Sequence, residues 1–179
     1  MAKIEVAYDT HIPVLLRALE GGGALLVAND GDGRPNAMTI GWAQVGIIWG
    51  RKIMSVMVRP SRYTYRCMAA GGDFAVCVPY PAQADSVLFC GTESGRDHDK
   101  FAECGFTPEP AAGLKSPGIA ECGVCWHCQI VNHADFVPER IMPEICKQCY
   151  SSGDYHRIYF GQILKVVADE DVVERMEQR

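Results

Sequence analysis

NAMTIGW at residues 36–42, RPSRYTY at residues 59–65 and SGRDHDKF at residues 94–101 say most about the fold and chemistry of this chain. None of the three matches a P-loop, because no GxxxxGK[ST] is present. No GxGxxG follows a predicted strand either, which argues against a Rossmann dinucleotide site. Any phosphate site in this chain must therefore be of another type.

The second stretch places Arg59, Ser61, Arg62 and Thr64 at a predicted strand-to-helix junction. Free backbone N–H groups and the positive end of the helix dipole favour an anion at such a junction. Guanidinium and hydroxyl groups add hydrogen bonds to a phosphate. Taken alone, however, the segment is more typical of a capped surface helix with two solvated arginines.

The third stretch precedes another short apolar helix. Gly95 allows the backbone to approach a ligand closely, and Lys100 offers a compact positive charge to a phosphate. The alternative is a charged helix start in which aspartate and lysine side chains pair with each other.

Short runs of apolar residues, separated by turn residues, predict a mainly β chain. We expect strands at residues 24–29, 36–43, 53–58, 74–78, 128–137 and 156–167. We expect short helices at residues 12–19, 61–69 (with Ser61 as N-cap) and 97–104, and a charged tail or terminal helix at residues 169–179. This pattern predicts a closed or partly closed β-barrel within one domain, residues 1–179.

The composition excludes several classes of protein. The net charge is −5 and no basic run is present, which argues against nucleic acid and anionic membrane surfaces as partners. No apolar run reaches the ~20 residues that span a bilayer, and no secretory signal is apparent at the start. We expect a cytoplasmic protein whose nine cysteines are mostly thiols.

In this order and spacing, the three stretches resemble those of the FMN-binding split-barrel proteins of the flavin-reductase-like and flavoredoxin type. The residues GDYH at 153–156, followed by IYFG at 158–161, resemble the GDHxxxFG strand of that family. The resemblance covers roughly residues 23–167 and implies an antiparallel Greek-key split barrel with a few short flanking helices. It also implies FMN as the cofactor and a homodimer with the flavin near the interface.

The resemblance carries over a set of flavin contacts residue by residue. On the ring and ribityl side these are Asn36, Met38, Thr39, Gly41 and Trp42, and on the phosphate and ribityl side Arg59, Ser61, Arg62, Tyr63, Thr64, Ser94, Gly95, Arg96 and Lys100. The family often has serine where this chain has Gly41. His156 and His133 are the candidates for substrate contact, although a lone histidine is more often structural.

The resemblance implies an FMN-dependent oxidoreductase that uses NAD(P)H, that is, an NAD(P)H:flavin oxidoreductase. The alternative is a flavoredoxin-type electron carrier that passes electrons to a protein partner and has no NAD(P)H activity of its own. The flavin performs the redox chemistry in either case, and the protein positions and tunes it.

The cysteines allow a different interpretation. Residues 125–149 read C-x2-C-x17-C-x2-C, which fits the spacing of a structural zinc site. However, if residues 126–131 are extended, Cys125 and Cys128 face opposite sides. A metal site, a labile disulfide and plain thiols, including Cys122, all remain open at this point, as does a zinc module without flavin. Cys67, Cys77, Cys90 and Cys104 lie in apolar stretches and are predicted to pack as small core residues.

Overall fold

The computed structural model describes residues 3–111 and 113–177. Its main sheet has eight strands, which pair antiparallel throughout. These strands are β1 (Ile4–Glu5), β2 (Ala24–Asn29), β3 (Pro35–Ile40), β4 (Ala43–Ile48), β5 (Arg51–Val58), β6 (Asp73–Val78), β9 (Val124–Asp135) and β10 (Arg157–Ala168). A second sheet pairs β7 (Pro108–Glu109) with β8 (Gly118–Ile119).

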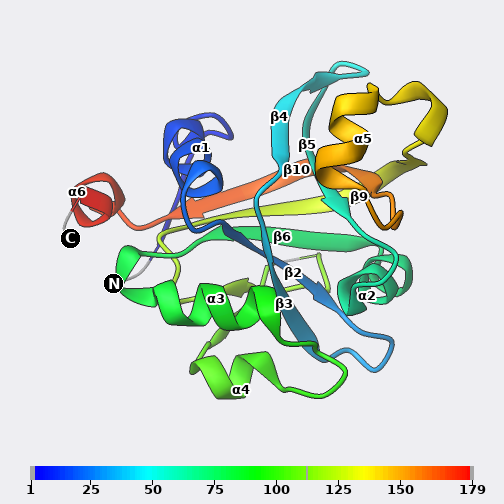
Figure 1. The fold of residues 1–179 in the computed structure, drawn as a ribbon. Coiled ribbons are helices and arrows are strands. Elements are labelled where there is room, and N and C mark those ends of the chain that lie inside the picture. The colour runs from blue at the N-terminus through cyan, green and yellow to red at the C-terminus, as the bar shows by residue number, and fades with distance from the viewer. Residues whose placement is uncertain (1–2, 112, 178–179) are drawn as a thin grey trace.

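Short helices flank the sheet (Figure 1). They are α1 (Ile12–Glu20), α2 (Tyr63–Gly71), α3 (Ala84–Thr92), α4 (Lys100–Cys104), α5 (Pro143–Cys149) and α6 (Val172–Glu177), with 3-10 turns η1 (Pro81–Gln83) and η2 (Pro138–Arg140). In Figure 1, α1 and α6 lie at one end of the molecule, α3 and α4 lie below the sheet, and α5 lies above the far ends of β5 and β10. Among the described residues, no helix is long and apolar enough to cross a membrane.

The strand order makes this sheet a split barrel. The order is β3-β2-β6-β9-β10-β5-β4, so the two edge strands, β3 and β4, are consecutive in the chain. Only Gly41 and Trp42 separate them. The sheet therefore curls until its edges are joined by the chain itself, while no ladder of hydrogen bonds between β3 and β4 closes it. We call the opening between these two strands the seam.

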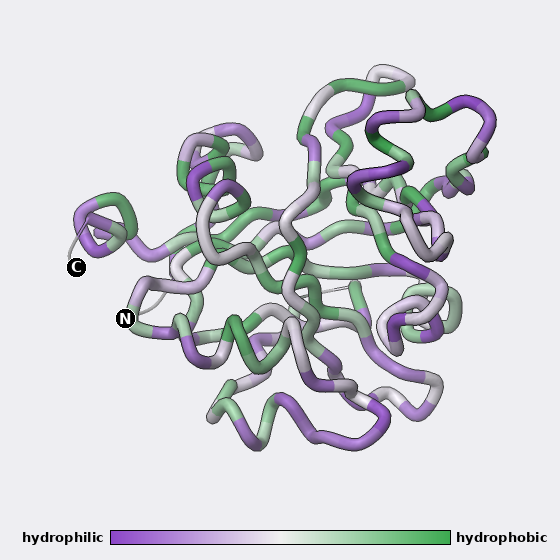
Figure 2. Tube along the Cα trace, viewed as in Figure 1, coloured by the Kyte–Doolittle hydropathy of each residue, from purple (hydrophilic) through white to green (hydrophobic). Residues whose placement is uncertain are grey.

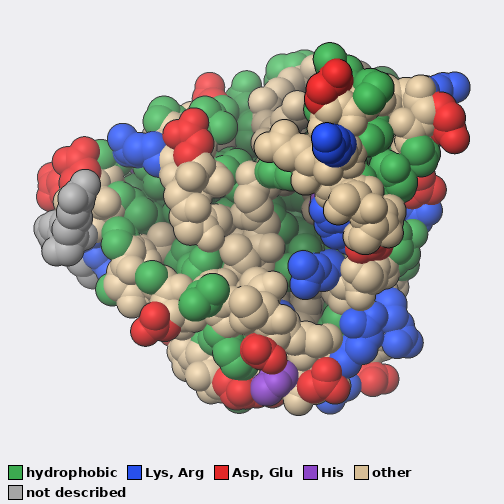
Figure 3. Space-filling view, viewed as in Figure 1, with side chains coloured by type: hydrophobic (Ala, Val, Ile, Leu, Met, Phe, Trp, Pro, Cys, Tyr) green, Lys and Arg blue, Asp and Glu red, His purple; other side chains and the backbone are tan. Residues whose placement is uncertain are grey.

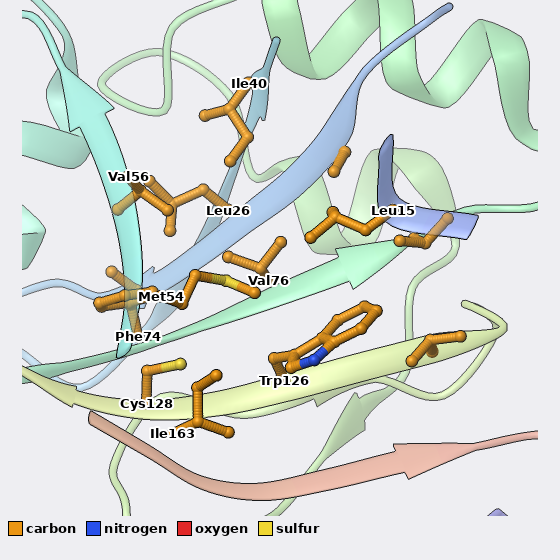
Figure 4. Packing of buried hydrophobic residues seen from close by; sticks show 14 of the residues in the cluster. Leu15, Leu26, Ile40, Met54, Val56, Phe74, Val76, Trp126, Cys128 and Ile163 are labelled. Carbon is orange, nitrogen blue, oxygen red and sulfur yellow. The ribbon is translucent and has the colours of Figure 1, made fainter. Parts of the chain in front are cut away.

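The core fills the inside of the curled sheet. Leu26, Val76 and Trp126 point inward from three neighbouring strands, and Val56 faces them from the other side (Figure 4). A second apolar cluster, on the outer face of β2, β6 and β9, includes Leu25 and Val27. Because β2 and β6 are buried on both faces, they read as continuous apolar runs rather than alternating ones. Figure 2 shows the sheet as mainly hydrophobic and the loop between α3 and α4 as strongly hydrophilic.

The predicted fold class is confirmed, and most predicted strands lie within a residue or two of the observed ones. Four local expectations were wrong. The predicted strand at 36–43 is interrupted at Gly41 and Trp42, and β9 begins at Val124, four residues earlier than expected. The helix after Pro60 begins at Tyr63 with Arg62 in the N-cap position, so Ser61 is not its cap. Helix α4 begins at Lys100, because Asp99 caps it by accepting a hydrogen bond from the Ala102 amide.

Two helices and four strands of the described residues had not been predicted: α3, α5, β1, β4, β7 and β8. The charged end of the chain does form a short helix, α6, in its described part.

Candidate functional site

A hollow of about 210 Å³ lies along the seam. The end of β3 and the link between the edge strands form one wall, and the end of β5, the start of α2 and the start of β10 form the other. Its lining residues are Met38, Thr39, Ile40, Gly41, Trp42, Met57, Arg59, Arg62, Gly91 and His156. We call this hollow the seam pocket. Its walls combine two methionines and two aromatic rings with the cations Arg59 and Arg62.

A second hollow, of about 110 Å³, lies between the starts of α2 and α4. We call it the loop pocket. It is lined by Asn36, Met38, Ser61, Arg62, Tyr63, Thr64, Cys90, Thr92, Glu93, Ser94, Gly95, Arg96 and Lys100. Met38 and Arg62 line both hollows. The two pockets therefore adjoin, and together they form one cleft. Aromatic side chains lie at its seam end, and cations line both pockets.

The aromatic end of the cleft is built around His156. Its ring lies 4.9 Å from the Trp42 ring, centroid to centroid, and its Nδ1 lies 2.8 Å from the hydroxyl of Tyr150. Burial, together with the positive charge of Arg59, lowers the pKa of His156 to about 4. The imidazole is therefore neutral at physiological pH. Trp42 is 42% exposed, so one face of this aromatic group is open to a ligand.

Two backbone carbonyl groups and an aromatic ring hold Arg59 in place. Its guanidinium donates to the carbonyl oxygens of Asp154 (3.1 Å) and Cys149 (2.8 Å). It also lies over the ring of Tyr150, 5.1 Å from the centroid. Carbonyl oxygens and an aromatic face fix the position of the guanidinium but leave its positive charge uncompensated.

Asp154 connects the turn before β10 to the segment before α2. Its backbone is left-handed, with φ of 57°, directly after Gly153, whose φ is 78°. Aspartate tolerates this conformation better than most residues. Its carboxylate accepts hydrogen bonds from the backbone amide of Ser61 (3.2 Å) and from its hydroxyl (2.6 Å). The segment before α2 is thus anchored to the turn before β10.

The cationic end depends on a close packing of three segments. The side-chain amide of Asn36 donates to the hydroxyl of Thr64 at 2.9 Å, and both residues are buried. Gly95 packs against them so tightly that an added Cβ would lie 2.0 Å from Asn36 Oδ1. Only glycine fits at position 95 with this packing. Lys100 is 4% exposed, and its ammonium donates to the carbonyl of Cys90 at 2.8 Å.

The charges in the cleft are unbalanced. Within the part of the chain that the structure describes, no carboxylate lies within 4.0 Å of the charged groups of Arg59, Arg62, Arg96 or Lys100. Arg96 instead donates to the Ser61 carbonyl at 3.2 Å. Figure 3 shows Lys and Arg side chains gathered on the side of this face between α5 and α2. Unpaired cations converging on one cleft, in a chain of net charge −5, favour an anionic ligand there.

The structure brings nearly all the predicted site residues to this cleft. All fourteen predicted flavin contacts line one of the two pockets, and His156 lines the seam pocket. His133 does not join them. It is exposed on β9, directly opposite Tyr159 of β10, with the two rings 5.9 Å apart. Residues that the sequence did not single out, among them Met57, Gly91 and Tyr150, also contribute to the walls or to their support.

Comparison with known proteins agrees with this geometry. The family model described as "Flavin reductase like domain" matches residues 16–176, which is most of the chain. The chain belongs to the flavin reductase-like family.

Solved structures of flavin reductase-like proteins share the fold. The flavoredoxin of Desulfovibrio vulgaris (Miyazaki F) has a TM-score of 0.66 at 25% identity, covering 83% of this chain and 69% of that one. The flavoredoxin of Methanosarcina acetivorans has a TM-score of 0.67 at 25% identity, covering 96% and 77% respectively. An uncharacterised protein of Pyrococcus abyssi is 24% identical over 150 residues, which is 84% of this chain and 75% of that protein.

The cysteine pattern does not assemble into one cluster in this flavin reductase-like fold. Cys125 and Cys128 both lie on β9, and they point to opposite faces, into the outer and the inner apolar cluster respectively. Cys146 and Cys149 lie on α5. Among the described residues, no three His, Cys, Asp or Glu side chains are grouped so that they could hold a metal ion. All nine cysteines are free thiols. Cys67, Cys77 and Cys90 are buried in the apolar clusters as predicted, whereas Cys104 is only half-buried and packs against the outer cluster.

Proposed function

We propose that the cleft binds FMN and that the protein moves electrons between NAD(P)H, or a redox partner, and this flavin. The observation that carries the proposal is the cleft itself, in which an aromatic pocket at the seam continues into a pocket of unpaired cations. FMN has the same division, with a flat apolar ring system at one end and a phosphate dianion at the other. Family membership and the flavoredoxin relatives support FMN over other ligands of this shape.

The residues of the loop pocket fit a phosphate. Gly95 brings backbone against the pocket wall, where a side chain would collide with Asn36. The buried Lys100 lies on one side of the loop pocket, and the exposed Arg62 and Arg96 lie on the other. Burial lowers the pKa of Lys100, which means that its charged form lacks solvation that an anion would restore. We assign Arg62, Ser94, Arg96 and Lys100 to the phosphate. The hydroxyl and the backbone amide of Ser61 already donate to the Asp154 carboxylate, so Ser61 holds this segment in place.

The residues of the seam pocket fit a flat ring. Met38 and Met57 offer polarisable sulfur, and Trp42 offers an open aromatic face. Gly41 is exposed between the edge strands and leaves the backbone accessible to polar atoms of a ligand. The Thr39 hydroxyl already donates to the Val87 carbonyl, so its role is to hold α3 against β3 rather than to bind the ring directly.

When bound, FMN supplies the redox chemistry, and the protein supplies binding, orientation and electrostatics. The cationic cleft stabilises negative charge on the ligand. Because His156 is neutral and its Nδ1 is paired with Tyr150, its Nε2 is the ring nitrogen left for a ligand. We propose His156 as a contact of the nicotinamide or of the flavin edge. His133, on the exposed part of β9, is not part of this proposal.

The first test is an absorption spectrum of protein purified without oxygen. We expect flavin absorption bands, either as isolated or after FMN is added and free FMN is removed. Bleaching of those bands by NADH or NADPH within the turnover time of typical enzymes would support an NAD(P)H:flavin oxidoreductase. A flavin that is bleached by dithionite but not by either nucleotide would support the flavoredoxin-type carrier. A protein that retains no flavin under any of these conditions would rule out the proposal.

We also propose a cytoplasmic homodimer. Support for the dimer comes from the edge strand β4 and its hairpin, where Ile47 and Trp49 are each 60% exposed, and from neighbouring Leu16, which is 50% exposed. Apolar side chains beside an unpaired strand edge are typical of surfaces that another chain covers. Nine cysteines in a chain of this length favour a reducing compartment, which would keep most of them as thiols. Light scattering coupled to size exclusion would test the dimer, and a monomer at micromolar concentration would contradict it.

A further inference from the structure

Two thiols meet at the base of the loop pocket. Cys90 on α3 and Cys104, the last residue of α4, have their sulfur atoms 4.0 Å apart. The sulfur of Cys90 is enclosed, with the residue 1% exposed, whereas Cys104 is half-buried and reachable from solvent. Two thiols at this distance are the reduced form of a pair that a small side-chain movement could join.

The position of this pair in the chain gives it a consequence for the site. The segment between the two cysteines carries Ser94, Gly95, Arg96 and Lys100, which include most of the cations and the close-packed glycine of the loop pocket. Cys90 is also joined to that segment directly, because its carbonyl accepts the hydrogen bond from the Lys100 ammonium. A bond between the two sulfurs would close the whole anion-binding segment into a ring.

We propose that Cys90 and Cys104 form a reversible disulfide which, on oxidation by hydrogen peroxide, restrains the loop that lines the anion pocket. The disulfide itself depends only on the two thiols. Its expected effect on cofactor retention rests on the proposed function.

The chemistry balances with peroxide as the oxidant. The Cys104 sulfur, as thiolate, attacks one oxygen of hydrogen peroxide, the O–O bond breaks, and a sulfenic acid and hydroxide form, the latter taking up a proton to give water. The Cys90 sulfur then displaces the hydroxyl group from the Cys104 sulfur, and the proton of the Cys90 thiol leaves with it as a second water. Two thiols are oxidised by two electrons in total, and one peroxide is reduced to two waters.

The environment of each sulfur sets this order of events. Burial and the neighbouring Cys104 raise the pKa of the Cys90 thiol to about 12, so Cys90 is protonated at neutral pH and shielded from oxidants. Because Cys104 is half-buried and Cys90 is enclosed, the Cys104 sulfur reacts with peroxide first. The sulfurs must approach by about 2 Å to reach bonding distance, a movement that rotation about the two Cα–Cβ bonds can supply.

Peptide mapping tests the disulfide without any flavin. Trypsin cleavage after Arg66, Arg96, Lys100 and Lys115 places Cys90 and Cys104 in separate peptides, residues 67–96 and 101–115. After treatment of the folded protein with hydrogen peroxide and blocking of free thiols, we expect these peptides to be linked, with fragmentation assigning the bond to Cys90 rather than to Cys67 or Cys77. Dithiothreitol should separate them. The Cys104→Ser variant should give no linked peptide, and Cys146→Ser, which removes a half-buried thiol on α5, should still give it.

The restraint is tested by two further measurements on the same samples. Trypsin should cut the native oxidised protein after exposed Arg96 more slowly than the reduced protein, and bound FMN should dissociate about three- to tenfold more slowly. Cys104→Ser should show neither difference. Two thiols that stay unlinked under peroxide, or a linked protein that trypsin cuts as fast as the reduced one, would overturn the proposal. If neither form binds FMN, the proposed function fails, while the peptide map and the trypsin rates still decide the disulfide.

Discussion

Gly95→Ala is the substitution that most sharply tests how the loop pocket is built. The new methyl carbon would lie 2.0 Å from Asn36 Oδ1 and 2.8 Å from Tyr63 Cδ1, far inside contact distance. Asn36 is 6% exposed and is held by its hydrogen bond to Thr64, so it has little room to yield. Either the buried hydrogen bond breaks, or the loop that carries Gly95 moves away from β3.

Either response weakens the anion site, and the broken hydrogen bond sets the scale. A buried hydrogen bond left unmade costs about 1–3 kcal/mol. Since 1.4 kcal/mol corresponds to a factor of ten in affinity, FMN should bind about five- to 140-fold more weakly to the variant. The control is Gly31→Ala, because a Cβ at Gly31 meets no atom within 4 Å and the φ there is not positive.

The assay is a titration of FMN fluorescence quenching, with thermal unfolding of the flavin-free proteins measured in parallel. Combining Gly95→Ala with Asn36→Ala removes the worst overlap, so the two substitutions together should cost less than the sum of their separate effects. A Gly95→Ala protein that binds FMN within twofold of the wild type would refute the close packing deduced here. So would strictly additive effects in the double variant.

Three more predictions concern residues around the cleft. Lys100→Met removes a buried cation, so FMN affinity should fall about ten- to 100-fold while riboflavin affinity changes less than about threefold, as measured by the same titration. Asp154→Ala removes both acceptors of Ser61 and should weaken FMN binding about five- to tenfold, whereas Asp154→Asn should lose less; equal losses would argue against an anchoring role. His156 binds protons more weakly in the folded state (pKa about 4) than its ordinary value of 6.5, so the unfolded state binds more protons between those pH values and stability rises with pH across that window. Between pH 7 and pH 4.5 the free energy of unfolding, measured with urea, should therefore fall by about 2 kcal/mol less in His156→Gln than in the wild type.

The sequence predicted the barrel because its strands and turns are strongly marked, and because the three polar stretches follow one another at a recognisable spacing. The predicted strand boundaries were wrong where burial on both faces removes the alternation of apolar and polar residues. The first residues of β9, from Val124 to Cys128, are buried on both faces, so no alternation marks where the strand begins. Ser61 looked like a helix cap because serine before an apolar run usually is one. Its hydroxyl instead meets Asp154, a residue 93 positions away, which no local pattern reveals.

The candidate site shows the same division between local and distant signals. The polar residues of the cleft could be predicted because they occur in clusters along the chain. Tyr150 and Met57 were not singled out, because neither belongs to one of those polar clusters and nothing in the local pattern shows that its side chain faces the cleft. The zinc-like spacing of the cysteines, which the sequence left open, shows the limit of a spacing argument. The spacing is right for four ligands, but Cys125 and Cys128 lie on one extended strand and diverge to its two faces.

The central claim is that the cationic end of the cleft recognises the phosphate of FMN. Comparing the dissociation constants of FMN and riboflavin for the wild type and for Arg62→Gln tests it most directly, since the two flavins differ only in that phosphate and Arg62 lines both pockets. We predict that the wild type binds FMN at least about 100-fold more tightly than riboflavin, and that the substitution reduces this ratio by about tenfold or more without weakening riboflavin binding. Equal binding of the two flavins, or a ratio that the substitution leaves unchanged, would contradict the account.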